Sequence, residues 1–287
     1  MKIEVHDDIN DIRLESDLKL TCRSTGLIIS CKVNSTLIAI LSYTKNYFHP
    51  YSLELHFKFF ESVNDSQILN FMFNKLKSEL ANSNFILKLE SDDTIYNEFI
   101  LNNNFREIRK TYEPELSITT MLEYYKCSTS HPHYNKQSFT MTNNLVLKVY
   151  EVYKSTHRAN PVGNIGMEEW KNIISKDLDL NHSIVIYSCT NEVIAYLFIF
   201  DYSKDKKDVG WIYFKNETAK NLLLDRFINI LYQLQETGIS SLCFEIDNTD
   251  PYSSELFAPF LNDISPSVIS YMNSEWLKRL SNSKSIK

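Results

Sequence analysis

Apolar residues recur along the chain with two periods, and these periods follow one another in the same order in both halves. Residues 34–43 and 191–200 each read as a polar turn followed by an apolar strand that contains an Ile-Ala pair. Runs rich in aromatic and β-branched residues come next, at 53–60 and 209–215, after a polar stretch in each case. Such runs favour strands, so each half is predicted to contain an antiparallel hairpin.

Helical periodicity follows both hairpins. Apolar residues recur at spacings of three and four over 68–80 and 222–234, which is the pattern of a helix with one buried face. A short apolar strand follows at 85–90 and at 241–246, and each ends in a cluster of Asp, Asn and Thr that can cap a further helix. The offset between corresponding segments is near-constant, at 157 residues for the strand at 34–43 and 156 for the strand at 85–90. The sequence therefore predicts one ββαβα unit written twice.

The two copies differ in what precedes the hairpin. In the second copy, helices are predicted over 146–157 and 167–174, with a turn at 160–164 between them. The first copy has too few residues before its hairpin for the same helices at full length. Between the copies, the Ser, Pro and Asn content of 127–135 favours irregular chain. The predicted domains are thus 1–126 and 138–287, joined by a linker over 127–137.

Charge and composition exclude several classes of protein. The chain carries 36 acidic and 30 basic residues, a formal charge of −6, and no basic run, which argues against binding to a nucleic-acid backbone. No apolar stretch approaches the roughly 20 residues that span a bilayer, and the first ten residues lack the features of a signal peptide. With 43% hydrophobic residues the chain is expected to fold, in the cytoplasm and without a membrane partner.

Cysteines and histidines give no metal or disulfide pattern. The five cysteines are odd in number, widely spaced and never in a CxxC pair, so most are expected to be small core residues. His131 and His133 lie in the predicted linker without a second pair of ligands, and are read as exposed loop residues. The sequence therefore predicts no metal site.

The doubled order of elements resembles the GCN5-related N-acetyltransferase (GNAT) superfamily in a tandem form. Residues 100–112 are similar to that family's end of the last helix and its sixth strand, with Asn104 where glycine is usual. Residues 160–170 resemble the paired first helices that form part of the family's acceptor pocket. The resemblance implies an α/β (α+β) chain of two GNAT-like domains. Each would be a mixed, mostly antiparallel twisted sheet flanked by helices.

The same resemblance implies a site for acetyl-CoA. In the family, a splayed strand binds the pantetheine arm, and the start of the next helix receives the pyrophosphate through its free amides and dipole. The family's turn there reads Gln or Arg, two residues, Gly, one residue, Gly or Ala, and neither copy has it. The first copy places Glu61 and Asp65 where an anion should bind, whereas the second has Lys215 and Lys220. The second copy is thus expected to bind CoA, through Tyr213, Phe214, Lys215, Thr218, Lys220 and Asn221.

Acetyl transfer to an amine needs a base for the amine and an acid for the departing thiolate. The family's tyrosine acid is replaced by Ile100 in the first copy and Phe257 in the second, and the nearest substitute in the second copy is Tyr252, one turn earlier. Candidate bases in that copy are Asp208, at the start of the third strand, and Glu245, on the fourth. A strand carboxylate more often faces solvent, and alternation alone does not place it in a pocket.

Two functions remain open. The first is an acetyl-CoA-dependent N-acetyltransferase that acts by direct transfer in a ternary complex on an unidentified small-molecule or peptide amine, as a monomer or homodimer. The alternative is a catalytically degenerate tandem protein that serves as a binding or interaction module, which the missing glycines and tyrosine favour. A third possibility, an aminoacyl transferase, would lead us to expect a basic RNA-binding surface, and the sequence shows none.

Overall fold

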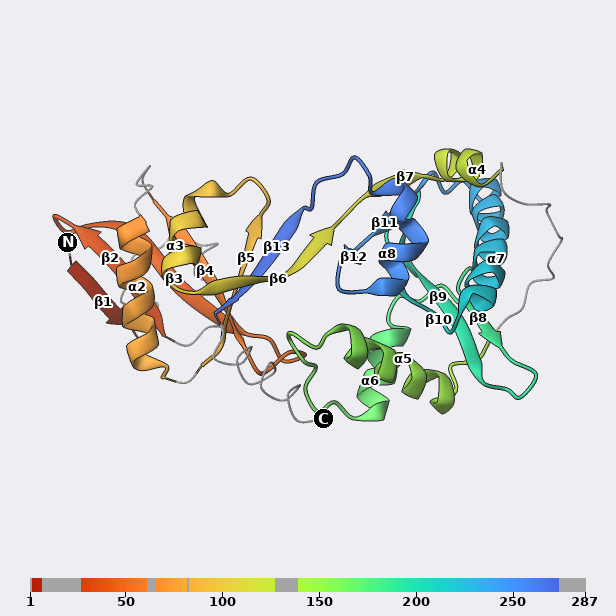
Figure 1. Cartoon of the computed structure of the whole chain (residues 1–287), viewed down its shortest axis with the longest axis horizontal. Coiled ribbons are helices and arrows are strands. Elements are labelled where there is room, and N and C mark those ends of the chain that lie inside the picture. The colour runs from red at the N-terminus through yellow and green to blue at the C-terminus, as the bar shows by residue number, and fades with distance from the viewer. Residues whose placement is uncertain (1, 7–26, 61–65, 82, 127–138, 274–287) are drawn as a thin grey trace. The chain divides into compact units, whose positions relative to one another are not determined.

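The structure is a computed structural model that describes residues 2–6, 27–60, 66–81, 83–126 and 139–273. The chain divides into two compact units. Unit 1 comprises Met1–Lys110, Ala159–Gly163 and Val268–Lys287, and unit 2 comprises Thr111–Arg158 and Asn164–Ser267. Each unit has a mixed sheet flanked by helices, which confirms the predicted fold class (Figure 1).

Unit 1 is built on a sheet with the strand order β1-β2-β3-β4-β5-β13-β6, and the end of β6 that belongs to unit 2 adds the short strand β12 to the same sheet. The parallel neighbours are β4 and β5, while β1 to β4 and the β5–β13 pair run antiparallel. Phe73 of the first helix packs in the core against Phe85, Phe99 and Phe105. In chain order the elements are β1 (Lys2–His6), β2 (Ile28–Val33), β3 (Thr36–Lys45), β4 (Leu53–Phe59), α2 (Ser66–Glu79), β5 (Phe85–Glu90), η2 (Thr94–Tyr96), α3 (Asn97–Asn102), β6 (Phe105–Tyr112) and β13 (Val268–Asn273).

Unit 2 has the strand order β7-β11-β10-β9-β8. Its long helix α7 packs against β8, β9 and β10, and α4 packs against α7 (Figure 1). The helices α5 and α6 pack against each other, and α5 contacts β9 and β10. The elements are β7 (Glu115–Ser117), α4 (Ile118–Lys126), α5 (Asn143–Thr156), α6 (Met167–Ser175), β8 (Ile184–Tyr187), β9 (Val193–Asp201), β10 (Lys206–Phe214), α7 (Glu217–Glu236), β11 (Ser241–Phe244), β12 (Ile246–Asp247), α8 (Pro251–Phe257) and η3 (Ala258–Phe260).

The predicted repeat is visible in the pairing of the strands. The hairpin β3–β4 corresponds to β9–β10, and each is followed by a helix and by a strand that pairs in parallel with the second hairpin strand. The parallel pairing ends at Leu55 and Leu87 in unit 1, and at Val209 and Phe244 in unit 2. In both copies the parallel pairing therefore ends before the second hairpin strand itself ends.

One strand of each sheet comes from an unexpected part of the chain. β13, which follows all of unit 2 in the sequence, pairs with β5 of unit 1 over six positions. β7, which follows β6, pairs with β11 of unit 2. The units thus divide the chain differently from the predicted domains 1–126 and 138–287, because sequence pattern identifies a strand but not the sheet edge that it joins. The predicted linker and most of the segment before the first hairpin lie outside the described residues.

Local signals in the sequence explain several element boundaries. Asp250 caps α8, where its Oδ1 accepts a hydrogen bond from the amide of Tyr252, as the Asp/Asn cluster predicted. Asn216 caps α7 in the same way by accepting from the amide of Ala219. Asn104, between α3 and β6, has a φ of 55°. Asparagine tolerates that left-handed conformation better than most residues, which explains why it can stand where glycine is usual.

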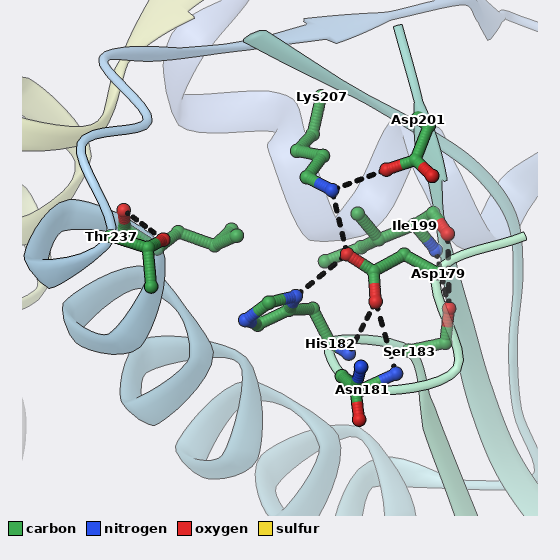
Figure 2. A network of polar contacts seen from close by, with 9 residues as sticks. Asp179, Asn181, His182, Ser183, Ile199, Asp201, Lys207 and Thr237 are labelled. Carbon is green, nitrogen blue, oxygen red and sulfur yellow. Dashed lines mark hydrogen bonds and ion pairs between the residues drawn. The ribbon is translucent and has the colours of Figure 1, made fainter. Parts of the chain in front are cut away.

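A partly buried ionic network fixes the loop before β8 to the hairpin β9–β10 (Figure 2). The Oδ2 of Asp179 accepts hydrogen bonds from His182 Nδ1 and Lys207 Nζ, both at 2.7 Å. Its Oδ1 accepts from the backbone amides of Asn181 and His182. Lys207 also pairs with Asp201. Burial alone would raise the pKa of Asp179, but the hydrogen bonds from His182 and Lys207 outweigh it and hold that pKa well below its usual range.

We predict that Asp179→Asn lowers the free energy of unfolding by about 2–3 kcal/mol at pH 7, because it leaves the half-buried ammonium of Lys207 with one exposed partner. Because the pKa of Asp179 is lower in the folded state, its contribution to stability is fully present when the pH is above the ordinary aspartate pKa of about 3.9. This contribution is lost progressively as the pH falls below that value. The gap between wild type and variant, measured by urea unfolding from pH 7 to pH 3, should therefore narrow toward acid. Asp201→Asn, at the exposed partner, is the control and should cost about 0–1 kcal/mol. An equal cost at both positions would contradict this account.

Candidate functional site

The edge of β10 that faces β11 is only partly paired. The two strands pair in parallel from Lys206 and Ser241 as far as Val209 and Phe244. Beyond that point β11 gives way to β12, which pairs with Thr111 and Tyr112 of β6. Among the described strands, the last part of β10 is paired with β9 alone. Its backbone donors and acceptors on the other edge have no partner among these strands. Folded proteins normally pair such groups, and an edge that stays unpaired can bind another extended chain.

A β-bulge lies where this unpaired stretch begins. The register with β9 shifts between Gly210 and Ile212, and Trp211 has a φ of 54°. That conformation is an outlier for a bulky residue. The extra residue changes the alternation of side chains, because Val209, Ile212 and Phe214 all lie in the core cluster that includes α7.

Trp211 lies against the helices on the opposite face of the sheet from α7. Its ring stacks on Tyr153 of α5, with centroids 5.4 Å apart, and lies 5.2 Å from Trp170 of α6. Tyr153 in turn stacks on His157 at 3.7 Å. Trp170 is fully buried, whereas Trp211 is only half-buried. An aromatic wall therefore flanks the start of the unpaired edge.

Tyr252 lies beside that edge. Its ring makes edge contacts with Tyr213 at 5.2 Å and with Phe214 at 5.3 Å. Successive strand residues point to opposite faces, so a ring that contacts both lies along the side of β10. Burial, followed by the neighbouring Tyr213 and Asp250, raises the pKa of Tyr252. The phenol thus keeps its proton at neutral pH and can donate it.

The three candidate catalytic residues are not brought to one place. Glu245 is exposed and directly follows Phe244, at the point where β11 leaves β10. Asp208 pairs with Cys243 in the closed part of the sheet, and burial raises its pKa. At about 3.3 Å per residue, Asp208 is roughly 15 Å along the strand from the contact between Tyr213 and Tyr252. Glu245 follows the last pair, Val209 and Phe244, so along the strands it lies nearer to Asp208 than to Tyr213.

The lysines at the start of α7 are each paired with carboxylates. Lys215 Nζ lies 2.7 Å from Glu192. Lys220 Nζ lies 2.8 Å from Glu217 and 2.7 Å from Glu255 of α8. The other two candidates on this turn, Thr218 and Asn221, are exposed. These three glutamates were not identified from the sequence, because their proximity depends on how β9, α7 and α8 pack.

In unit 1 a tyrosine occupies a similar place. Tyr96 packs against Phe57 of β4, with ring centroids 5.8 Å apart, and burial raises its pKa to about 12. Glu61 and Asp65, the acidic residues that disfavour an anion in the first copy, lie outside the described residues, as do His131 and His133. In the described part of the chain, no group of three or more His, Cys, Asp or Glu is arranged to hold a metal. No described helix is both long and apolar enough to cross a membrane.

Comparison with solved structures identifies the fold. The structure of a GCN5-related N-acetyltransferase from Sphaerobacter thermophilus matches 89% of this chain and 84% of its own, with a TM-score of 0.57 and 7% identity. The fold is that of the GNAT superfamily. A GNAT-family acetyltransferase from Colwellia psychrerythraea matches 95% of this chain and 98% of its own, with a TM-score of 0.46 and 9% identity. A tandem GNAT protein from the clavulanic acid biosynthesis pathway matches 94% and 98%, with a TM-score of 0.48 and 6% identity. No family model and no curated protein matches the sequence.

Within the GNAT fold, the conformation of Trp211 makes a prediction about stability. At an ordinary exposed strand position such as Lys58, glycine should be less stable than alanine by about 0.5–1 kcal/mol. At Trp211 the order should reverse, with Trp211→Gly more stable than Trp211→Ala by about 1 kcal/mol, because only glycine adopts a positive φ without strain. Both variants lose the aromatic contacts, so their difference isolates the backbone. Urea unfolding of the two pairs measures it, and the same order at both positions would contradict the bulge.

Proposed function

We propose that unit 2 is an acyl-CoA-dependent N-acyltransferase that uses acetyl-CoA and a small-molecule or peptide amine. The observation that carries this proposal is the unpaired edge of β10 from Trp211 to Phe214, with Tyr252 beside it. The pantetheine arm contains amides that can exchange hydrogen bonds with such an edge, as an added strand does. The GNAT fold of the chain is consistent with this use of the edge.

The reaction proceeds by direct transfer while both substrates are bound. The neutral amine attacks the thioester carbonyl, a C–N bond forms, and the C–S bond breaks. Glu245 takes the proton from the amine, directly or through water, since it is exposed at the divergence of the strands. Tyr252 donates its proton to the departing thiolate, because its raised pKa keeps it protonated until that step. Asp208 has no role in either proton transfer.

The charge at the start of α7 should control cofactor affinity. We predict that Glu255→Gln tightens acetyl-CoA binding several-fold, because it removes one of the two carboxylates that compete with the pyrophosphate for Lys220. Lys220→Glu should weaken binding at least tenfold, since it adds negative charge where the phosphates bind. Isothermal titration of acetyl-CoA into each purified variant measures both effects.

The matched control is Ser66→Glu at the start of α2, which places the same charge at the corresponding helix of unit 1. It should leave binding unchanged. Binding lost in Ser66→Glu and retained in Lys220→Glu would assign the cofactor to unit 1 and contradict the proposal.

Removal of the proposed acid should affect turnover and not binding. We expect Tyr252→Phe to lower kcat about 10- to 100-fold at pH 7.5, with the Kd for acetyl-CoA unchanged, because the ring contacts with Tyr213 and Phe214 remain. Release of CoA thiol in the presence of an amine panel gives kcat. An unchanged kcat would remove Tyr252 from the mechanism.

A second function, a binding protein that does not catalyse, is favoured by a specific observation. Both lysines at the α7 turn are paired with carboxylates, and that turn lacks glycine. This alternative predicts no heat on titration with acetyl-CoA at millimolar concentration. It also predicts no change in the thermal unfolding midpoint under the same conditions.

A further inference from the structure

One lysine near the unpaired edge is placed differently from the two at the α7 turn. Lys148 lies on α5 and is half-buried, and its ammonium lies 4.5 Å from the ring centroid of Tyr213. Tyr252 contacts the edge of the same ring. A single aromatic ring thus separates this cation from the proposed catalytic phenol.

Lys148 also lacks the ion pairs that its neighbours have. No carboxylate among the described residues lies within 4.0 Å of its ammonium, whereas Lys215 and Lys220 are both within 2.8 Å of one. Its attraction to Glu192 acts over a longer range. A half-buried ammonium that rests on a ring keeps its capacity for a strong, charge-assisted hydrogen bond to an anion.

Lys148 lies on the face of the sheet that α5 and α6 cover. α5 packs against the face of β10 that is opposite α7, and Tyr153 of the same helix stacks on Trp211 at the bulge. The face near the phenol therefore combines one cation with half-buried aromatic rings. Asp208, a carboxylate further down the same strand, is roughly 15 Å away.

We infer that Lys148 binds a carboxylate of the amine acceptor, and that the acceptor is an amino acid with an apolar or aromatic side chain. This inference rests on the proposed function. The carboxylate pairs with the ammonium, the side chain packs near Trp211 and Tyr153, and the amine is held beside Tyr252. A polyamine, or a lysine side chain in a basic peptide, is disfavoured because its second cation would meet Lys148.

The first test needs neither cofactor nor turnover. N-acetyl-L-phenylalanine and N-acetylphenethylamine differ by one carboxylate, and each is titrated into the protein by isothermal calorimetry. We expect the carboxylated ligand to bind wild type about 10- to 100-fold more tightly, as for one charge-assisted hydrogen bond. Lys148→Met should abolish that difference, and Lys148→Arg should retain part of it.

The matched control is Lys154→Met. Lys154 is also on α5 and also lies over a tyrosine ring, 5.3 Å from the centroid of Tyr150, but it is exposed. Its replacement should leave both affinities unchanged. Equal affinity of wild type for the two ligands, or the same loss in Lys154→Met as in Lys148→Met, would overturn the inference.

The second test separates the acceptor from the cofactor as the source of the anion. Lys148→Met should raise KM for L-phenylalanine about 10- to 100-fold, with little change in KM for phenethylamine or in the Kd for acetyl-CoA. A weaker Kd for acetyl-CoA with unchanged acceptor KM would make Lys148 a cofactor residue and overturn the inference. If the wild-type protein does not bind acetyl-CoA but still prefers the carboxylated ligand, the proposed function is refuted, while the carboxylate site at Lys148 is supported.

Discussion

The short parallel pairing between β10 and β11 constrains the rest of unit 2. Four residue pairs hold the strands together, and after Phe244 the chain turns to pair with β6 instead. Beyond this point β10 continues with one edge unpaired, and the unusual features of unit 2 lie along that edge. The bulge at Trp211 begins the unpaired stretch, and Tyr252 packs along its side. A chain that only needed stability would extend the ladder, because unpaired backbone groups are costly when buried.

The glutamates around the start of α7 oppose the binding of an anionic cofactor at the unpaired edge. The free energies of the ion pairs show how strong this opposition is. Lys220 is paired with two glutamates that are themselves well exposed. Exposed ion pairs are worth about 0–1 kcal/mol each, so a doubly charged pyrophosphate at a helix start can displace them. If CoA binds as proposed, the carboxylates would therefore lower its affinity without blocking the site. Loss of the glycine turn acts in the same direction, because side chains limit how closely the phosphate can approach the backbone.

Much of the fold could be predicted from the sequence, because it depends on local signals. Period and turn chemistry indicated the hairpin β9–β10, the helix α7 and the cap at Asp250. The strands β7 and β13 could not be assigned to their sheets, since pairing with β11 and β5 depends on long-range contacts. For the site, the sequence singled out Tyr252 but grouped Asp208 with it. The bulge at Trp211 shifts the register between β10 and β9. In the sequence, its one indication is the glycine before Trp211. Lys148 was missed, because its importance depends on a ring from another element.

The proposed function requires that the unpaired edge of β10 bind the pantetheine arm of acetyl-CoA. Amide hydrogen exchange at single-residue resolution, with and without saturating acetyl-CoA, measures this binding at the edge itself. We expect some amides between Trp211 and Phe214 to become strongly protected on binding, while those of β4 in unit 1 exchange at unchanged rates. Protection confined to β4, or acetyl-CoA bound with no change along β10, would contradict it.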